Sequence, residues 1–208
     1  MGRWPSKEAT LARLTEVAGA LFYQRGARAV SVDEISAESG VTKMTIYRRF
    51  MSKDQIVEAC LHANASRMLG AIDAIDEDPD GPAGRVRAII CFIARTMLSE
   101  QGRGLLALNL AVEFPDPNHR VRAISAETVA ALRQRLADAS RLADRARAEA
   151  FADHVVLLIQ GACAGCHALG PEASVQALKP AVDAALAFHG LDGARFDAAK
   201  TRWPQAAA

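Results

Sequence analysis

Residues 31–53, SVDEISAESGVTKMTIYRRFMSK, limit the possible folds of this chain more than any other segment. Ser31 and Glu34 match a capping box, in which the serine oxygen and the glutamate carboxylate each accept a backbone amide that the first helical turn leaves unpaired. Gly40 predicts the end of this helix, since glycine tolerates the left-handed backbone of a sharp exit. Thr42 can cap a second helix. The segment therefore predicts two short helices joined by a tight turn.

The second helix of this segment is predicted to have one apolar side and one basic side. Val41, Ile46 and Phe50 can pack against the first helix. The other side then exposes Thr42, Lys43, Met44, Thr45, Tyr47, Arg48 and Arg49. Residues 42–53 hold four basic side chains and no acidic one. A short basic helix after a glycine turn suits the major groove of duplex DNA, so a helix-turn-helix is predicted; an ordinary helical hairpin with a solvated basic face is the alternative.

Composition favours an all-α protein whose basic character is local. Half of the 208 residues are apolar and only 5% are aromatic, which is typical of a helical chain long enough to bury a substantial core. The formal net charge is only +1. Residues 1–60 carry nine Lys and Arg against seven Asp and Glu. The charge therefore predicts a local footprint on nucleic acid rather than general coating of it.

Residues 10–60 resemble the DNA-binding domain of the tetracycline-repressor (TetR) family of one-component regulators. The resemblance rests on the segments LFYQRGARAVSVDEIS, GVTKMTIY, YRRF and SKDQIV. It implies an all-α fold, with a three-helix helix-turn-helix DNA-binding domain over residues 1–51 and a helical effector-binding and dimerisation domain over residues 52–208. It also implies a homodimeric transcriptional regulator, a repressor, that binds a palindromic operator in double-stranded DNA and is released by a small molecule.

The resemblance and the charge pattern together suggest roles on DNA. The residues expected at base edges or the adjacent backbone are Lys43, Met44, Thr45 and Tyr47. The residues expected at phosphates are Thr42, Arg48, Arg49 and Lys53. For Lys53 the resemblance implies the phosphate contact, and the amides and dipole at a helix start would add to the charge of the lysine.

Hydrophobic periodicity, caps and breakers predict the remaining helices. The expected helices span residues 6–25, 52–75, 85–100, 105–114, 119–140 and 142–169. Residues 76–84, DEDPDGPAG, are predicted to be a linker. Pro180 either starts a last helix that reaches His189 or kinks one longer helix from Ala173. Residues 191–208 are predicted to be a tail.

The last two predicted helices are expected to form the dimer interface. The family uses its last two core helices for this purpose, and segments 151–169 and 180–189 are apolar on more than one face. The expected interface residues are Val155, Leu158, Ile159, Ala162, Val182, Ala185 and Leu186. A two-fold dimer would present two recognition helices to successive major grooves.

The resemblance places an effector pocket in the second domain. Polar groups within apolar segments are candidates for it, and Asn109 and Glu113 share a helix face because they are four residues apart. The candidate ligand-binding residues are Phe92, Arg95, Met97, Asn109, Glu113 and His154. For each of them, the alternative is an ordinary side chain of a partly exposed helix.

Cys163, Cys166 and His167 match the C-x-x-C-H pattern of covalent haem attachment. Cys163 and His167 are also four apart and could share a metal ion. The motif lies in an apolar helix of a chain without a secretion signal, which favours buried, reduced thiols. No cofactor is therefore predicted, and a haem- or metal-binding helical protein stays as the alternative function.

Other classes of protein find little support in the sequence. It has no signal peptide and no apolar run near the ~18 residues of a membrane helix, which predicts a cytoplasmic protein without membrane contact. It has no nucleophile elbow, phosphate loop, paired-carboxylate signature or zinc-ligand set, so an enzyme is not predicted.

Overall fold

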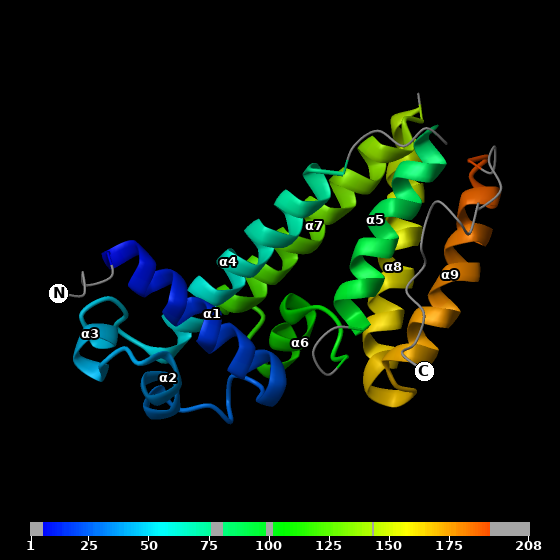
Figure 1. Cartoon of the computed structure of the whole chain (residues 1–208). Helices are drawn as coiled ribbons and strands as arrows, with labels where there is room; N and C mark the ends of the chain where they lie inside the picture. Colours follow the sequence, from blue (N-terminus) through cyan, green and yellow to red (C-terminus); the bar gives the residue numbers. More distant parts are fainter. Residues whose placement is uncertain (1–5, 76–80, 99–101, 143, 192–208) are drawn as a thin grey trace.

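The computed structural model describes residues 6–75, 81–98, 102–142 and 144–191. Within these ranges the regular structure consists of nine α-helices and no strand, which confirms the all-α prediction (Figure 1). In chain order they are α1 (Lys7–Arg25), α2 (Val32–Ser39), α3 (Lys43–Tyr47), α4 (Lys53–Asp73), α5 (Gly81–Leu98), α6 (Leu106–Glu113), α7 (Arg120–Ser140), α8 (Arg145–Ala168) and α9 (Pro171–Phe188). None of the described helices combines the length and apolarity that a bilayer crossing needs.

The first core holds α1, α2, α3 and the start of α4 together. Phe22, Ile35 and Ile46 are at most 1% exposed at its centre. Burying a side chain of this size stabilises a fold by roughly 1.5–3 kcal/mol. The same cluster continues into α6 through Leu110 and into α7 through Val121. The N-terminal helices therefore share a core with later helices, and the expected domain boundary at residue 51 stays a prediction.

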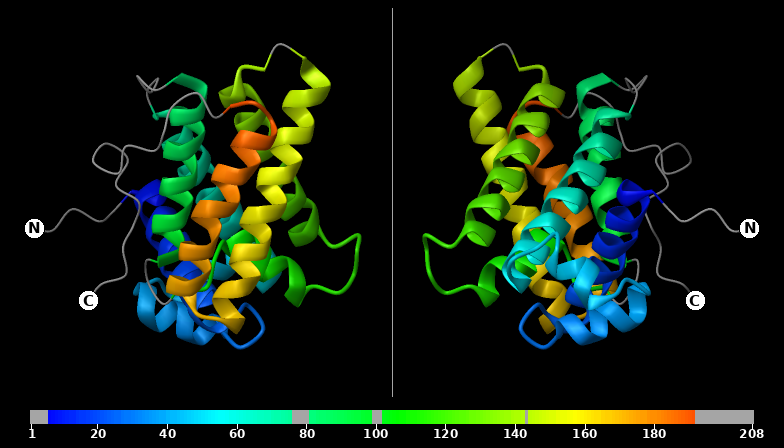
Figure 2. Two further views of the ribbon diagram at one scale, coloured as in Figure 1. Left: turned by 90° about the vertical axis from the view of Figure 1, so that its right-hand side faces the viewer. Right: turned by 90° about the vertical axis from the view of Figure 1, so that its left-hand side faces the viewer.

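The second core lies between α5, α7, α8, α9 and the distal half of α4. Ile90, Ile93, Phe151 and Val175 are buried at its centre. α2 and α3 lie at one end of the molecule and α8 and α9 at the other, while α4 and α7 run side by side between them (Figure 1). In the left view of Figure 2, α8 and α9 face the viewer as an adjacent pair.

Two expected helix boundaries differ from the structure. α5 begins at Gly81 and so takes residues 81–84 from the predicted linker, because proline near a helix start costs no hydrogen bond. α9 is one helix from Pro171 with Pro180 inside it, so a helix starting at Pro180 is wrong and the longer alternative is nearer. Pro171 supplies the favoured first-turn proline, and Pro180 lies exposed. The rest of the predicted linker, residues 76–80, and tail residues 192–208 lie outside the described residues.

Candidate functional site

The helix-turn-helix begins with the predicted capping box. The Ser31 amide donates to the Glu34 carboxylate at 2.8 Å, and the Glu34 amide donates to the Ser31 hydroxyl at 3.2 Å. Arg25 also pairs with Glu34 at 2.8 Å. The Ser31 amide, then the Ser31 hydroxyl and Arg25, lower the pKa of Glu34 from 4.5 to about 2. The start of α2 is therefore held by a carboxylate that is charged at neutral pH.

The turn between α2 and α3 is fixed by local hydrogen bonds. Gly40 adopts the left-handed conformation, with φ of 66°. The Ser36 hydroxyl donates to the Val41 carbonyl at 2.8 Å, and the Val41 amide donates to the Ser39 hydroxyl at 3.2 Å. The Thr42 hydroxyl then caps α3 by accepting from the Thr45 amide at 3.3 Å. The direction of α3 is thus set by hydrogen bonds whose two partners are at most five positions apart.

α3 is fastened by apolar side chains and exposes the predicted surface. Ile46 is fully buried, and Val41 and Phe50 are 7% exposed. Met44 is 75% exposed and Tyr47 is 55% exposed. The other predicted residues on this face are also exposed: Thr42, Lys43, Thr45, Arg48 and Arg49. The structure therefore brings these seven side chains together on one surface, the recognition surface.

The arginines lie at the edge of the recognition surface. Arg48 caps the end of α3 and Arg49 follows it. Together with Thr45 they line a cavity of about 460 Å³ between α3 and α1, whose other walls include Leu11 and Leu14. Both arginines therefore lie just beyond the end of α3 and are exposed.

The side chain of Lys53 binds two backbone carbonyls of the chain itself. Its ammonium donates to the Ala27 carbonyl at 2.8 Å and to the Val30 carbonyl at 3.1 Å. A lysine has three N–H donors, so two of them hold the segment between α1 and α2. Sequence reasoning missed this contact, because its partners lie 23 and 26 residues earlier in the chain.

The predicted effector residues do not converge on one place. Met97 is fully buried in the second core, and Arg95 is exposed. The His154 ring packs against Phe188, the last residue of α9, and against His189, which follows it.

Asn109 and Glu113 both bind backbone or side-chain groups of the protein itself. The Asn109 amide donates to the Arg103 carbonyl at 2.6 Å, and its oxygen lies 3.1 Å from Nε2 of His167. The Glu113 carboxylate accepts hydrogen bonds from the amides of Ala27 at 3.1 Å and Arg28 at 3.0 Å. These two residues therefore tie α6 to α8 and to the N-terminal helices.

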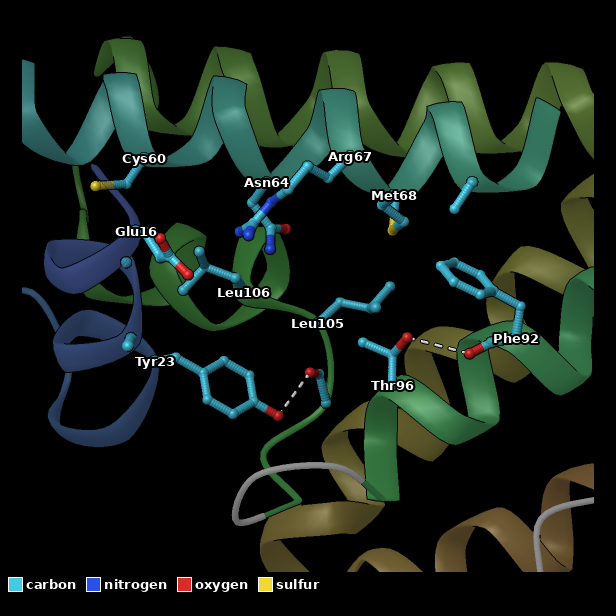
Figure 3. Close-up of a pocket in the computed structure, with 14 residues that line it drawn as sticks. Glu16, Tyr23, Cys60, Asn64, Arg67, Met68, Phe92, Thr96, Leu105 and Leu106 are labelled. Carbon is cyan, nitrogen blue, oxygen red and sulfur yellow. Dashed lines mark hydrogen bonds between the residues drawn. The ribbon is translucent and has the colours of Figure 1, made fainter. Parts of the chain in front are cut away.

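One of the six predicted effector residues, Phe92, lines a cavity of about 480 Å³. This cavity lies between α1, α4, α5 and residues 104–106 (Figure 3). Glu16, Asn64 and Arg67 contribute polar groups to it, as do Tyr23 and Thr96. Cys60 lies in its wall, and burial raises the pKa of this thiol to about 12, so the thiol stays protonated. The sequence did not reveal this cavity, because its walls come from four separate segments of the chain.

The segment that follows α5 is bonded to α1. The Tyr23 hydroxyl accepts from the Arg103 amide at 2.9 Å and donates to the Gly104 carbonyl at 3.1 Å. The Arg103 guanidinium donates to the Gln24 carbonyl. Burial is the main cause of the raised pKa of Tyr23. Together with Glu113, these bonds fix residues 102–113 to the end of α1.

Most of the expected dimer residues are buried within the chain itself. Val155, Ile159, Val182, Ala185 and Leu186 are at most 2% exposed in the second core. Packing within the single chain is therefore enough to bury these apolar side chains, without a second copy. Leu158 and Ala162 are partly buried against the same core. Leu157 and Phe188, on the outward sides of α8 and α9, are 66% and 81% exposed.

The cysteine motif has the geometry of packed thiols. Cys163 and Cys166 are buried, whereas His167 is exposed. Burial raises the pKa of Cys163 to about 11 and also raises that of Cys166. Metal ions bind the thiolate form, which these environments disfavour. The described residues also contain no cluster of three or more His, Cys, Asp or Glu that could hold a metal ion. These observations favour packed thiols at this motif.

Comparison with known proteins agrees with this geometry. The family described as "Bacterial regulatory proteins, tetR family" matches residues 14–60. The Transposon Tn10 TetC protein of Escherichia coli is 42% identical over 53 residues, which is 26% of this chain and 27% of that protein. The match thus spans about a quarter of that relative.

Solved structures match over most of the chain. A TetR-family transcriptional regulator from Streptomyces coelicolor has a TM-score of 0.75 at 28% identity, covering 86% of this chain and 95% of that one. A TetR transcriptional regulator from Legionella pneumophila has the same fold, with a TM-score of 0.75 at 14% identity, covering 88% of this chain and 98% of that one. Residues 14–60 therefore match the tetR family of bacterial regulatory proteins, and most of the chain has the fold of a solved TetR-family regulator.

Proposed function

We propose that this protein is a ligand-responsive transcriptional repressor that binds a palindromic operator as a homodimer and leaves it when a small molecule binds. The observation that carries the proposal is the recognition surface. A capped turn fixes a short helix whose apolar side is buried and whose exposed side is basic. Such a helix fits the major groove, which is wide enough to admit it.

Within the recognition surface, the helix residues Lys43, Met44, Thr45 and Tyr47 are proposed to meet base edges or the adjacent backbone. Lys43 forms an ion pair with Asp33, and both side chains are more than half exposed. Exposed ion pairs contribute at most about 1 kcal/mol, so DNA can displace the Asp33 carboxylate at little cost.

Thr42, Arg48, Arg49 and Lys53 are proposed to contact phosphates. Lys53 keeps one N–H for this purpose while the other two hold the carbonyls of Ala27 and Val30. Its proposed role is therefore double: it orders the segment before α2 and adds positive charge at the start of α4.

The proposed dimer surface is the outward side of α8 and α9. Leu157, Gly161, Ala164 and Ala168 are exposed at spacings of three or four residues, so they form one stripe along α8. A Cβ added to Gly161 would meet nothing within 4 Å, so the stripe is open to close approach. Phe188 extends the apolar surface onto α9. No other described helix covers this pair in the left view of Figure 2.

Effector binding is proposed to shift the population of dimers toward a spacing of the two recognition helices that does not match the operator. The bonds from Glu113 and Tyr23 give the second domain a rigid connection to the N-terminal helices. A change in the position of α6 would therefore reach the recognition surface.

Selection of bound fragments from genomic DNA tests the proposal. The expected result is enrichment of an inverted repeat whose half-sites are about one helical turn, or a multiple of it, apart. Lys43→Ala and Arg49→Ala together should weaken binding to that repeat by at least tenfold. Arg145→Ala, at an 84% exposed site at the start of α8, is the control. No enrichment by the wild-type protein, or unchanged affinity in the double variant, would contradict the proposal.

A further inference from the structure

The cavity between α1 and α4 lies where the DNA-binding domain meets the rest of the chain. Glu16, Gly19, Ala20 and Tyr23 of α1 form one wall, and α4 forms the facing wall with five residues that include Arg67. α1 is also the helix on which α2 packs. A molecule in this cavity would therefore touch the support of the recognition surface directly.

The polar end of the cavity opens to solvent and carries two exposed charged side chains, Glu16 and Arg67. Glu16, Asn64 and Arg67 gather at this end (Figure 3). Among the described residues, no ion pair or hydrogen bond engages the Arg67 guanidinium or the Glu16 carboxylate. A guanidinium binds a carboxylate through two parallel N–H bonds, and the Asn64 amide can add a third.

The other end of the cavity is mainly apolar, and its one labelled hydroxyl, that of Thr96, donates to the Phe92 carbonyl at 3.1 Å. Met68, Phe92 and Leu105 form its walls. Ala71, three residues after Met68 and on the same side of α4, also lines the cavity and leaves space because its side chain is small. Methionine adapts its shape and makes favourable contacts with aromatic rings. The volume of about 480 Å³ is within the range of roughly 300–1,000 Å³ found for small-molecule sites.

We propose that this cavity is the effector site and that its ligand is an amphipathic acid with an apolar body of one or two rings and a carboxylate next to a hydrogen-bond donor. This rests on the proposed function. The carboxylate binds Arg67 and Asn64, and the adjacent amino or hydroxyl group donates to Glu16. An acid without the donor is repelled by the Glu16 carboxylate. An amine without the carboxylate forms no ion pair with Arg67, so both should bind more weakly.

The cavity wall is continuous with the bonds that fasten the two parts of the chain. Tyr23, in the α1 wall, binds residues Arg103 and Gly104. The same segment leads through α6 to Glu113, which binds the loop after α1. A ligand that changes the spacing of α1 and α4 therefore strains these bonds and moves the recognition surface.

Calorimetry with matched probes tests the ligand class. L-tryptophan, indole-3-propionate and tryptamine share one apolar body, and L-phenylalanine, 3-phenylpropionate and phenethylamine repeat the set with a smaller one. The amino acid of at least one set should bind most tightly, the acid at least threefold more weakly, and the amine most weakly. Equal affinities within both sets, or no binding by either amino acid up to millimolar concentration, would overturn the proposal.

Three variants locate the site. Arg67→Gln should lower the affinity for the amino acid and for the plain acid by at least tenfold. It should change the affinity for the amine by less than threefold. Ala71→Phe should fill the apolar end and abolish binding of all probes. Arg145→Gln, remote from the cavity, should bind as the wild type does. If Arg67→Gln and Ala71→Phe both bind normally, the ligand is elsewhere and the proposal fails.

Operator binding separates this inference from the proposed function. Without ligand, Arg67→Gln should bind the selected operator within threefold of the wild type. The tightest probe should release wild-type protein from the operator but not Arg67→Gln. Calorimetry reports on the cavity even if no operator is found. Conversely, operator binding that no probe affects, despite binding in the cavity, would retain the regulator and reject the effector assignment.

Discussion

The carboxylate of Glu113, on α6, lies against Gly26, at the end of α1. A Cβ on Gly26 would be 2.9 Å from Oε1 of Glu113, closer than real side chains approach. Gly26 also has a φ of 83°, which glycine adopts without strain. The missing side chain lets the carboxylate accept the amides of Ala27 and Arg28. A contact across 86 residues thus joins α6 to the loop before α2.

Glu113→Gln should destabilise the protein by about 1–2 kcal/mol, because an amide has only one oxygen to accept the two backbone N–H groups. Gly26→Ala should cost at least as much, since it adds backbone strain of about 1–3 kcal/mol to the clash. Urea unfolding measures both. Glu127→Gln, on the exposed side of α7, is the matched control and should change stability by less than about 0.5 kcal/mol. A cost for Glu113→Gln no larger than that of the control would show that the contact is unimportant.

The capping box predicts a defined acid sensitivity. Because the pKa of Glu34 falls from 4.5 to about 2 on folding, its stabilisation is complete above pH 4.5 and is lost as the pH falls toward 2. The difference in unfolding free energy between wild type and Glu34→Gln should therefore shrink across this range. Glu38→Gln, on the same helix, controls for the general loss of a charge. A wild-type advantage that is constant from pH 7 to pH 2 would contradict the prediction.

Substitutions of Ile46 and Met44 should have different effects: the first should lower the stability of the fold, and the second should alter DNA recognition. Ile46→Ala leaves a space in a fully packed core and should cost about 2–5 kcal/mol. Met44→Ala, at a 75% exposed position, should stay within about 0.5 kcal/mol of the wild type. The Met44 variant should instead change which base pairs are preferred in the operator. Thermal unfolding and a binding selection on randomised half-sites measure the two effects, and an unchanged preference would remove Met44 from the base contacts.

Substitutions of Lys53 and Arg48 should differ in their effect on stability, although both side chains are proposed to contact phosphates. Arg48→Ala should lower the salt slope of DNA binding by about 1 and leave stability nearly unchanged. Lys53→Ala should lower the slope similarly and also cost about 1–2 kcal/mol of stability, because the carbonyls of Ala27 and Val30 lose their donor. Binding titrations at several salt concentrations, with urea unfolding, test both. An unaltered slope in Lys53→Ala would leave that lysine with a structural role alone.

Charged substitutions on the outward side of α8 and α9 should prevent the chain from forming a dimer. Phe188→Arg and Leu157→Arg, combined, should give a monomer with unchanged helix content, because both side chains are exposed in the single chain. Val155→Ala should instead lower stability by about 1–3 kcal/mol and leave assembly intact, because Val155 is fully buried within the chain. Sedimentation and circular dichroism measure these outcomes. A dimeric double variant would place the interface elsewhere.

Local features of this protein could be predicted from the sequence. The capping box at Ser31, the left-handed Gly40 and the cap at Thr42 all depend on residues within a few positions of one another. Periodicity also predicted which side of α3 would be buried, as Ile46 confirms. Such features follow from the chemistry of neighbouring residues, so the helix-turn-helix and the all-α class were accessible without a structure.

Contacts between distant helices were decided by the tertiary structure alone. Periodicity marks an apolar face but does not say which partner covers it, so Val155 and Leu186 were assigned to a second copy although they pack within the chain. The same limit applies to polar groups, because Glu113 and Lys53 find backbone partners far away in the sequence. The sequence determined the recognition surface through local hydrogen bonds; the packing of α1 against α4 and α6 decided where the cavity and the connections between domains lie.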